Sequence, residues 1–343
     1  MKHLSQQIQH NCHISDAQYA GNYTLCIYLL KMREFYRWES QLPFTKKLDN
    51  SDIGEWLTQR EGLWDDIDEQ PLANLIINNQ EFDLFENDDI NKELEKQQLV
   101  YSGGYGLYGK PVFFLGELLH KEIRDDFTLY ISGKEFARDL AAPPGMLQNK
   151  TVYIRRESLR RFIWEKYEES FWHKQENPLS RALACYDFIN KTEEALESMT
   201  DNEVDTVLQH EIGEIMAGKI LGSHWEEMLT TLPHSQAEIM SRAVRDNIAD
   251  MLNTLPRLLE KNNSSQIHFY FANLSSMRKM IFPELTLAYK NWLETKNTSK
   301  LKNLINEATD HWISMAKQIL NLYNDHGKKS QTKIETLINN NYL

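Results

Sequence analysis

The sequence predicts a mainly α-helical fold, a multi-helix core with a small antiparallel β element near residues 99–156. Two observations predict this class. Apolar residues recur at helical spacing over most of the chain, and the half that begins at Pro178 consists almost wholly of such stretches. The period changes only after Val100, where a glycine-rich aromatic stretch precedes two short runs of β character.

These patterns divide the chain into three regions. We expect an N-terminal helical region over residues 1–98, a small β-containing region over residues 99–156 and a C-terminal helical region over residues 157–343. The three can also pack as one compact domain, because 343 residues are enough to bury a sizeable core.

The composition is that of a folded globular protein, with 41% hydrophobic residues and eight tryptophans. A net charge of -12 argues against nucleic acid or an anionic membrane as the partner and leaves a small molecule or a protein. The three cysteines form no CxxC motif, which favours a reducing compartment. The N-terminus lacks the apolar core of a signal peptide, and no apolar run approaches the roughly 20 residues of a membrane span. We therefore expect a cytoplasmic protein.

The first strong helical element extends from about Asn22 to Ser40, after polar residues that are expected to fray. Its apolar residues surround the helix axis, so the helix is expected to be largely buried. Its charged residues must then be paired or face a cavity. Glu34 either forms an internal ion pair with Lys31 or an arginine, or lines a site together with an arginine.

The elements that follow are less strongly signalled. Asp52 and Glu55 have the spacing of a capping box at a helix start, and another short helix is expected over residues 72–77. Two antiparallel strands are expected over residues 112–119 and 127–131, with a further strand at 152–154. A short helix is expected over residues 134–141, which Pro143 ends.

A long amphipathic helix is expected to begin at Glu157, and arginines crowd its start. Four of the seven residues 155–161 are arginines, in a chain whose net charge is negative. One interpretation is a solvated face that pairs with the protein's own carboxylates. The other is a clamp for an anion or phosphate, because arginine forks suit planar oxyanions. The candidate anion-binding residues are Arg155, Arg156 and Arg160, with Arg161 beside them.

In the C-terminal half, helices are expected near residues 180–198, 201–221, 236–259, 282–294 and 301–324. The helix over 201–221 has the clearest ends: Thr200 and Glu203 have capping-box spacing, and Gly222 follows as a C′ residue. Glu211 lies on its apolar stripe. A carboxylate there is costly unless it is paired or bound.

The same helix contains the densest set of candidate metal ligands. His210 and Glu214 are four residues apart, so they share a helix face and could hold a zinc, iron or manganese ion, with His224 as a third ligand. The stretch resembles half of the HExxH zinc-protease motif, but a glutamate replaces the second histidine. Glu211 would be the acid-base residue, with Glu34 facing it. Alternatively, Glu211 pairs with an arginine of another helix.

Five segments resemble a bacterial family of uncharacterised, mainly helical cytosolic proteins. They read LLKMREFYRWE, ARDLAAPPGMLQ, IRRESLRRFIWEK, HEIGE and HFYFANLSSMRK and span most of the chain. The resemblance implies one shared architecture and no activity.

Three function classes remain open, and the sequence does not decide whether the protein is an enzyme. The most specific hypothesis is a soluble enzyme with a metal-assisted or acid-base site on the helix that contains Glu211. The alternatives are a non-catalytic interaction or scaffold protein, and a protein that binds a small anionic ligand through the arginines near Arg156.

Overall fold

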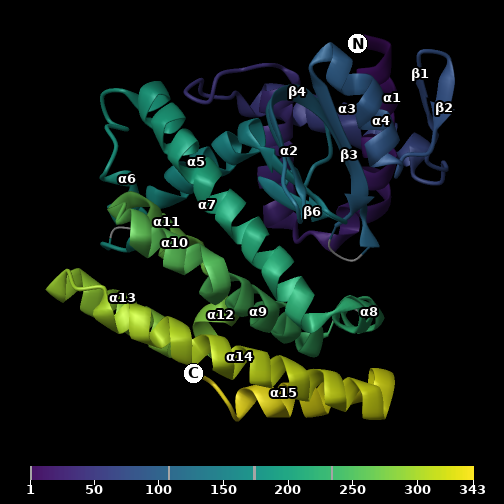
Figure 1. Ribbon diagram of the computed structural model, residues 1–343. Helices are drawn as coiled ribbons and strands as arrows, with labels where there is room; N and C mark the ends of the chain where they lie inside the picture. The colour runs from purple at the N-terminus through teal and green to yellow at the C-terminus, as the bar shows by residue number, and fades with distance from the viewer. Residues whose placement is uncertain (1, 107–108, 173–174, 233–234) are drawn as a thin grey trace. The chain divides into compact units, whose positions relative to one another are not determined.

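The computed structural model describes residues 2–106, 109–172, 175–232 and 235–343 (Figure 1). The chain divides into two compact units, Met1–Glu165 and Lys166–Leu343. Each unit has a hydrophobic core of its own.

The N-terminal unit begins with three helices, α1 (Lys2–Tyr19), α2 (Leu25–Glu39) and α3 (Asn50–Ile67). A hairpin of β1 (Leu75–Ile77) and β2 (Gln80–Phe82) and the short helix α4 (Asn87–Leu94) lead into the main sheet. Its strands are β3 (Leu99–Tyr105), β4 (Pro111–Ile123), β5 (Thr128–Arg138), β6 (Gly145–Gln148) and β7 (Thr151–Arg155). The helix α5 (Arg156–Ser170) follows β7 directly.

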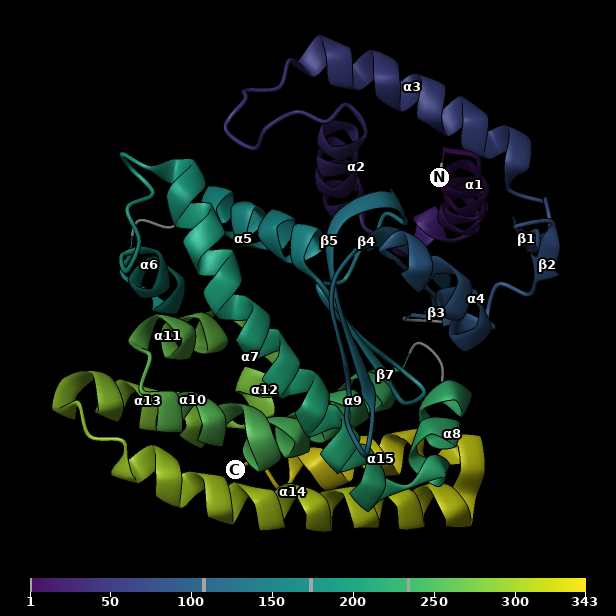
Figure 2. The same ribbon diagram turned by 45° about the horizontal axis from the view of Figure 1, so that its top comes forward.

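The main sheet has five strands in the order β3-β4-β5-β7-β6 and curls into a half-barrel (Figure 2). β5 and β7 are parallel, with Ser132 opposite Arg155, and the other neighbouring strands are antiparallel. Register shifts between Leu115 and His120 interrupt the pairing of β4 with β5. Irregularities of this kind bend a strand and increase its twist, which fits the curl of the sheet.

The core of the N-terminal unit lies between α1 and the sheet. Apolar residues one turn apart on α1 contact inward-facing residues of the strands. This cluster includes Leu4, Ile8, Cys12, Tyr101, Phe113 and Leu115. Because Ile8 is fully buried, the first residues form a packed helix and do not fray as expected.

The predicted fold class is wrong in the extent of its β structure, and an all-α description does not hold. Helices make up 66% of the chain, but strands make up 14%, in a mixed five-stranded sheet and a second sheet outside residues 99–156. Two physical reasons explain the error. The first six residues of β3 are all buried and show no alternation. β5 continues to Arg138 through a segment that was predicted to be a short helix ending before Pro143.

The prediction that the helix near Asn22 to Ser40 is largely buried also fails. In α2, Leu25, Leu29 and Leu30 are exposed, whereas Glu34 and Arg37 are buried. The two charged residues therefore lie on the inner side of the helix.

The C-terminal unit is helical throughout its described residues. After α6 (Pro178–Leu183) comes the long helix α7 (Thr192–Leu221), followed by α8 (Ser223–Thr231) and α9 (Gln236–Ala249). A π-helical turn, η4 (Asp250–Thr254), joins α9 to α10 (Leu255–Lys261). The remaining helices are α11 (Ser264–Asn273), α12 (Ser276–Ile281), α13 (Pro283–Thr295), α14 (Ser299–His326) and α15 (Gln331–Asn339). None of the helices in the described ranges is long and apolar enough to cross a lipid bilayer.

The start predicted for the helix at Asp201 is wrong, because α7 begins at Thr192. The Thr200 hydroxyl donates to the Leu196 carbonyl oxygen at 2.6 Å inside the helix, so no capping box forms there. The end at Gly222 is confirmed, and this glycine has a φ of +75°.

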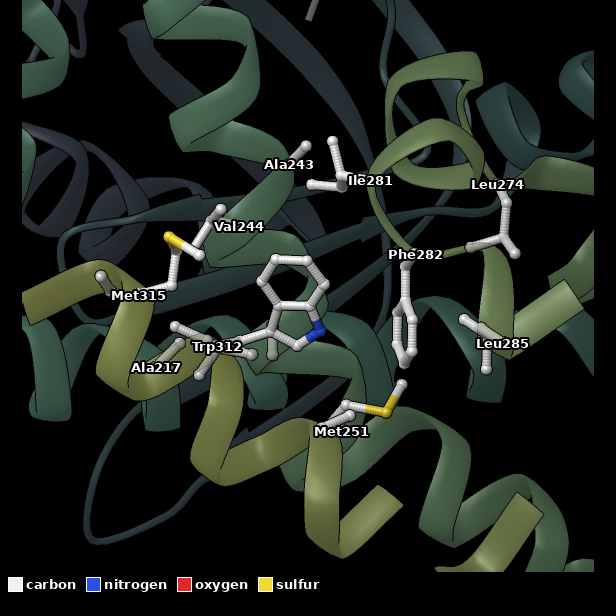
Figure 3. Close-up of a cluster of buried hydrophobic side chains, with 14 of the residues drawn as sticks. Ala217, Ala243, Val244, Met251, Leu274, Ile281, Phe282, Leu285, Trp312 and Met315 are labelled. Atoms are coloured by element: carbon white, nitrogen blue, oxygen red, sulfur yellow. The ribbon is translucent and has the colours of Figure 1, made fainter. Parts of the chain in front are cut away.

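The core of the C-terminal unit surrounds Trp312 of α14 (Figure 3). The centres of the Phe282 and Trp312 rings are 5.5 Å apart, and the rings meet edge to face. Val244 of α9 and Met315 lie beside Trp312 (Figure 3). Close packing extends to α7, because a Cβ on Gly213 would lie 2.4 Å from the backbone oxygen of Ala249.

Candidate anion-binding site

The N-terminal unit contains a cavity of about 670 Å³. It is bordered by the start of α1, by α2 and the loop after it, by the end of β5 and by the first turns of α5. The charged residues that line it are Glu34, Arg37, Glu39, Lys134, Glu135, Arg138, Glu157, Arg160 and Arg161. A cavity of this size suits a small organic ligand.

Arg37 fixes the loop that borders the cavity after α2. The chain turns back at Gln41, which has a φ of +51°. The Arg37 guanidinium then donates to the backbone oxygens of Pro43 and Lys46, each at 2.9 Å, and its Nε donates to Glu34 at 3.1 Å. Because its donors are used in this way, Arg37 has a structural role.

Glu135 of β5, which lines the cavity, and Arg155 of β7, which does not, form a buried, two-pronged ion pair. The Nε and Nη2 atoms of Arg155 lie 2.8 and 2.9 Å from the two Glu135 oxygens, and Ser158 donates to the same carboxylate at 2.7 Å. Burial alone would lower the pKa of Arg155, but Glu135 outweighs it and raises that pKa. The charge of Arg155 is thus paired within the protein, although its buried Nη1 has no hydrogen-bond partner.

Arg138, the last residue of β5, lacks such a partner. It is only 2% exposed, and its guanidinium lies 4.7 Å from the centre of the Trp38 ring. Its Nη2 donates to the Glu34 backbone oxygen at 3.2 Å, whereas its Nε has no acceptor, and no carboxylate of the described residues pairs with it. Burial and the neighbouring Arg161 lower the pKa of Arg138 to about 10. The charges of Glu135 and Glu157 oppose this shift, but neither carboxylate forms an ion pair with Arg138.

Glu157, in the first turn of α5, is the acidic counterpart. Its Oε2 accepts a hydrogen bond from the backbone N–H of Glu135. Burial and the Glu135 carboxylate raise the pKa of Glu157 to about 7, although Arg138 and Lys134 oppose this shift. Glu157 forms no ion pair with any described residue. It is consequently shared between its acid and carboxylate forms near neutral pH.

The other arginines of α5 have protein partners. Arg161 donates to the Ala142 backbone oxygen at 2.8 Å and pairs with Glu165. The Arg160 guanidinium lies 5.4 Å from the centre of the Phe44 ring, within the range of a cation–π contact.

Aromatic and aliphatic residues complete the lining. They are Trp38, Leu42, Pro43, Phe44 and Phe136. A cavity with an unpaired guanidinium and an apolar wall is suited to an amphipathic anion rather than to a metal ion or a bare cation.

Only some of the residues predicted from the sequence for acid-base or anion chemistry line the cavity. Glu34 and Arg160 belong to the lining, whereas Arg155, the partner of Glu135, and Arg156, the first residue of α5, do not. Arg138 was not among the predicted site residues, because its segment was predicted to be a short helix and is the end of β5.

In the C-terminal unit, the predicted metal residues form an ion-pair network. His210 Nδ1 lies 2.8 Å from Asp250 of the π-helical turn, and Arg278 of α12 holds the other Asp250 oxygen. Glu214 pairs with Arg245 at 2.8 Å. Burial would lower the pKa of His210, but Asp250 outweighs it and raises that pKa to about 10. The imidazole is therefore protonated and fastens α7 to the neighbouring helices.

Glu211 is buried, with only 6% of its surface exposed, yet it forms no hydrogen bond or ion pair with any described residue. Burial and Glu214 raise its pKa to about 8, so it is mainly a neutral acid at pH 7. Protonation thus lowers the cost of placing it on the apolar stripe, because a neutral acid is less costly to bury than a carboxylate.

The prediction of a metal-binding protein is not supported. His224 is exposed and lies 3.4 Å from Glu227, not beside His210 and Glu214 as a third ligand. Across the described ranges, no group of three or more His, Cys, Asp or Glu side chains is arranged to hold a metal ion. The reason is that Asp250 and Arg245 engage the two predicted ligands.

Two family models cover most of the sequence. Residues 3–155 match the N-terminal domain, and residues 160–341 the C-terminal domain, of a family of unknown function, DUF6866. Neither a curated protein nor a solved structure matches the chain. The resemblance to an uncharacterised family is confirmed in this respect, and the chain belongs to the DUF6866 family.

Proposed function

We propose that the N-terminal unit binds a small organic acid in the cavity beside Arg138. The carboxylate of the ligand contacts the Arg138 guanidinium, and the apolar part of the ligand lies against Trp38, Phe44 and Phe136. This corresponds to the anion-binding function expected for the arginine-rich segment, with a different arginine as the anchor.

The observation that carries the proposal is the contrast between two buried arginines. Arg155 has a two-pronged carboxylate partner, and its pKa is raised. Arg138 is nearly as buried but has one hydrogen bond, to a backbone oxygen, and its pKa is lowered. An external carboxylate would supply for Arg138 what Glu135 supplies for Arg155.

No carboxylate of the lining forms an ion pair with Arg138, because each is engaged elsewhere or shifted toward its neutral form, and Glu135 and Glu157 act on it only through their charge. Glu34 pairs with Arg33 and Arg37, Glu39 pairs with Arg60, and Glu135 pairs with Arg155. Glu157 has a raised pKa. The positive potential at Arg138 is therefore available to a ligand.

The test is binding of 3-phenylpropionate, measured by thermal shift and by isothermal titration calorimetry on the full chain at pH 6. Its neutral amide has the same shape and is the control ligand. Inorganic phosphate tests a compact anion without an apolar part. We expect the carboxylate to stabilise the protein and the amide to have no effect, because only the former offers an anion to Arg138.

Two variants locate the effect. Arg138→Met should weaken binding about 10- to 100-fold, the loss of a charge-assisted hydrogen bond worth about 1.5–3 kcal/mol. Arg124→Met removes an exposed arginine that pairs with Glu122 in the same unit and should leave binding unchanged. Equal binding by wild type and Arg138→Met would overturn the proposal, and phosphate binding alone would reject the organic acid in favour of a phosphate ligand.

A further inference from the structure

We propose that Glu157 is the proton-exchanging residue of this site, so that the ligand anion is taken up together with one proton. In the complex, Glu157 is a neutral acid and donates a hydrogen bond to an oxygen of the bound carboxylate. The inference rests on the proposed function, because it concerns the same cavity and the same ligand class.

The geometry places Glu157 and Arg138 in the lining of one cavity, and neither forms an ion pair with a described residue. One Glu157 oxygen accepts from the backbone N–H of Glu135. The other, Oε1, makes no hydrogen bond within the described part of the chain. It is the group that a bound ligand would meet.

The charges that face Glu157 come from three elements. From β5 they are Lys134, Glu135 and Arg138, from α2 they are Glu34, Arg37 and Glu39, and from α5 itself they are Arg160 and Arg161. The three other carboxylates have arginine partners. Glu157 is therefore the one acid of this lining whose charge would oppose a second anion directly.

An anion bound to Arg138 shifts the protonation equilibrium of Glu157 toward the neutral acid, through two effects. It removes the attraction by which Arg138 favours the Glu157 carboxylate, and it adds a negative charge nearby. Both effects favour the protonated acid. The acid form also gains an acceptor for its proton, whereas the carboxylate form would repel the ligand.

The pH dependence follows from the sign of this linkage. Burial and Glu135 raise the pKa of Glu157 to about 7 in the free protein, so below that pH the acid is already formed and binding takes up little proton. Above that pH, Glu157 is a carboxylate in the free protein and takes up one proton for each ligand that binds. If only the acid form binds, affinity falls about 10-fold between pH 6 and pH 8.

The test is calorimetric titration of the full chain with 3-phenylpropionate at pH 6 and pH 8. Bis-Tris, imidazole and Tris are the buffers, because they are cationic and cannot occupy the anion site. Their different ionisation enthalpies report the number of protons taken up. We expect close to one proton per ligand at pH 8 and little uptake at pH 6.

Glu157→Gln supplies the decisive variant, because its amide also donates a hydrogen bond but does not titrate. It should bind with the same affinity at both pH values and take up no proton. Glu122→Gln removes an exposed carboxylate of the same unit that lies outside the lining and should retain the wild-type pH dependence. Wild-type binding without proton uptake, or unchanged uptake in Glu157→Gln, would overturn this inference while leaving the proposed function intact. Absence of binding at both pH 6 and pH 8 would overturn the proposed function itself.

Discussion

Replacing the two buried arginines by methionine should have opposite consequences for stability. Arg155→Met leaves the Glu135 carboxylate buried without its partner. Arg138→Met removes a cation that has no carboxylate partner among the described residues. Methionine keeps the length and much of the apolar contact of the arginine stem, so the two changes differ mainly in the charge that they leave behind.

The magnitudes follow from the contacts of each residue. Breaking a buried ion pair from one side typically destabilises a protein by about 3–5 kcal/mol, which is the expected cost of Arg155→Met. Arg138→Met loses one neutral-acceptor hydrogen bond, worth about 1 kcal/mol, and the contact with Trp38, worth about 0.5–2 kcal/mol. It also removes the desolvation cost of a buried ion, which is as large as, or larger than, the loss of these two contacts. We expect Arg138→Met to lie within about 1 kcal/mol of wild type or to be more stable.

The assay is urea unfolding of the full chain without added acid, followed by circular dichroism and by hydrogen exchange of peptides from β5. The peptide readout is needed because two compact units can unfold in separate transitions. Equal and large destabilisation by both substitutions would refute the reasoning. Arg138 would then be a structural residue rather than a preformed anion anchor.

Three further outcomes are expected. Gly213→Ala should destabilise the C-terminal unit by about 1–3 kcal/mol in urea unfolding, because its Cβ would meet the α9 backbone. Gly218→Ala on the same helix is the control: its Cβ would meet nothing within 4 Å, so the substitution should be neutral or stabilising. His210→Gln should destabilise at pH 7, and the difference from wild type should shrink as pH rises through about 10, because a raised histidine pKa contributes stability that is lost on deprotonation; an unchanged difference at pH 10.5 would contradict this. Arg37→Met should release the loop over residues 41–47 and speed its hydrogen exchange and its cleavage after Lys46, and unchanged rates would reject a clamping role.

Local sequence patterns were sufficient to predict the helices in which buried residues recur at helical spacing. The helix expected from residue 236 begins there as α9 and buries Val244 and Ile248, and the glycine end of α7 forms as predicted. Strands were predicted less well, because β3 is buried on both faces and therefore lacks the alternation that marks a half-buried strand.

The candidate site was less accessible to sequence analysis, for a physical reason. Glu135 and Arg138 are buried in the last part of β5, where charged residues are rare, and their segment was predicted to be a short helix. The arginines near Arg156 attracted attention by their density, but density does not show which guanidinium lacks a partner. Pairing of Arg155 with Glu135 across parallel strands depends on a sheet register that single-sequence patterns do not specify.

The same limitation applied to the helix that contains His210. The spacing of His210 and Glu214 correctly placed both residues on neighbouring turns. It could not reveal that Asp250 and Arg245, from another helix and its π-helical turn, engage them. Partners from distant segments decided the chemistry in both units.

The most direct test of the central claim is a titration of the arginine Nε–H signals by ¹H–¹⁵N NMR, with Arg138 assigned from its loss in Arg138→Met. If Arg138 is the anchor, 3-phenylpropionate shifts its Nε–H signal, the amide does not, and the signal of the paired Arg155 stays in place. An Arg138 signal that does not move while the acid binds would contradict the account.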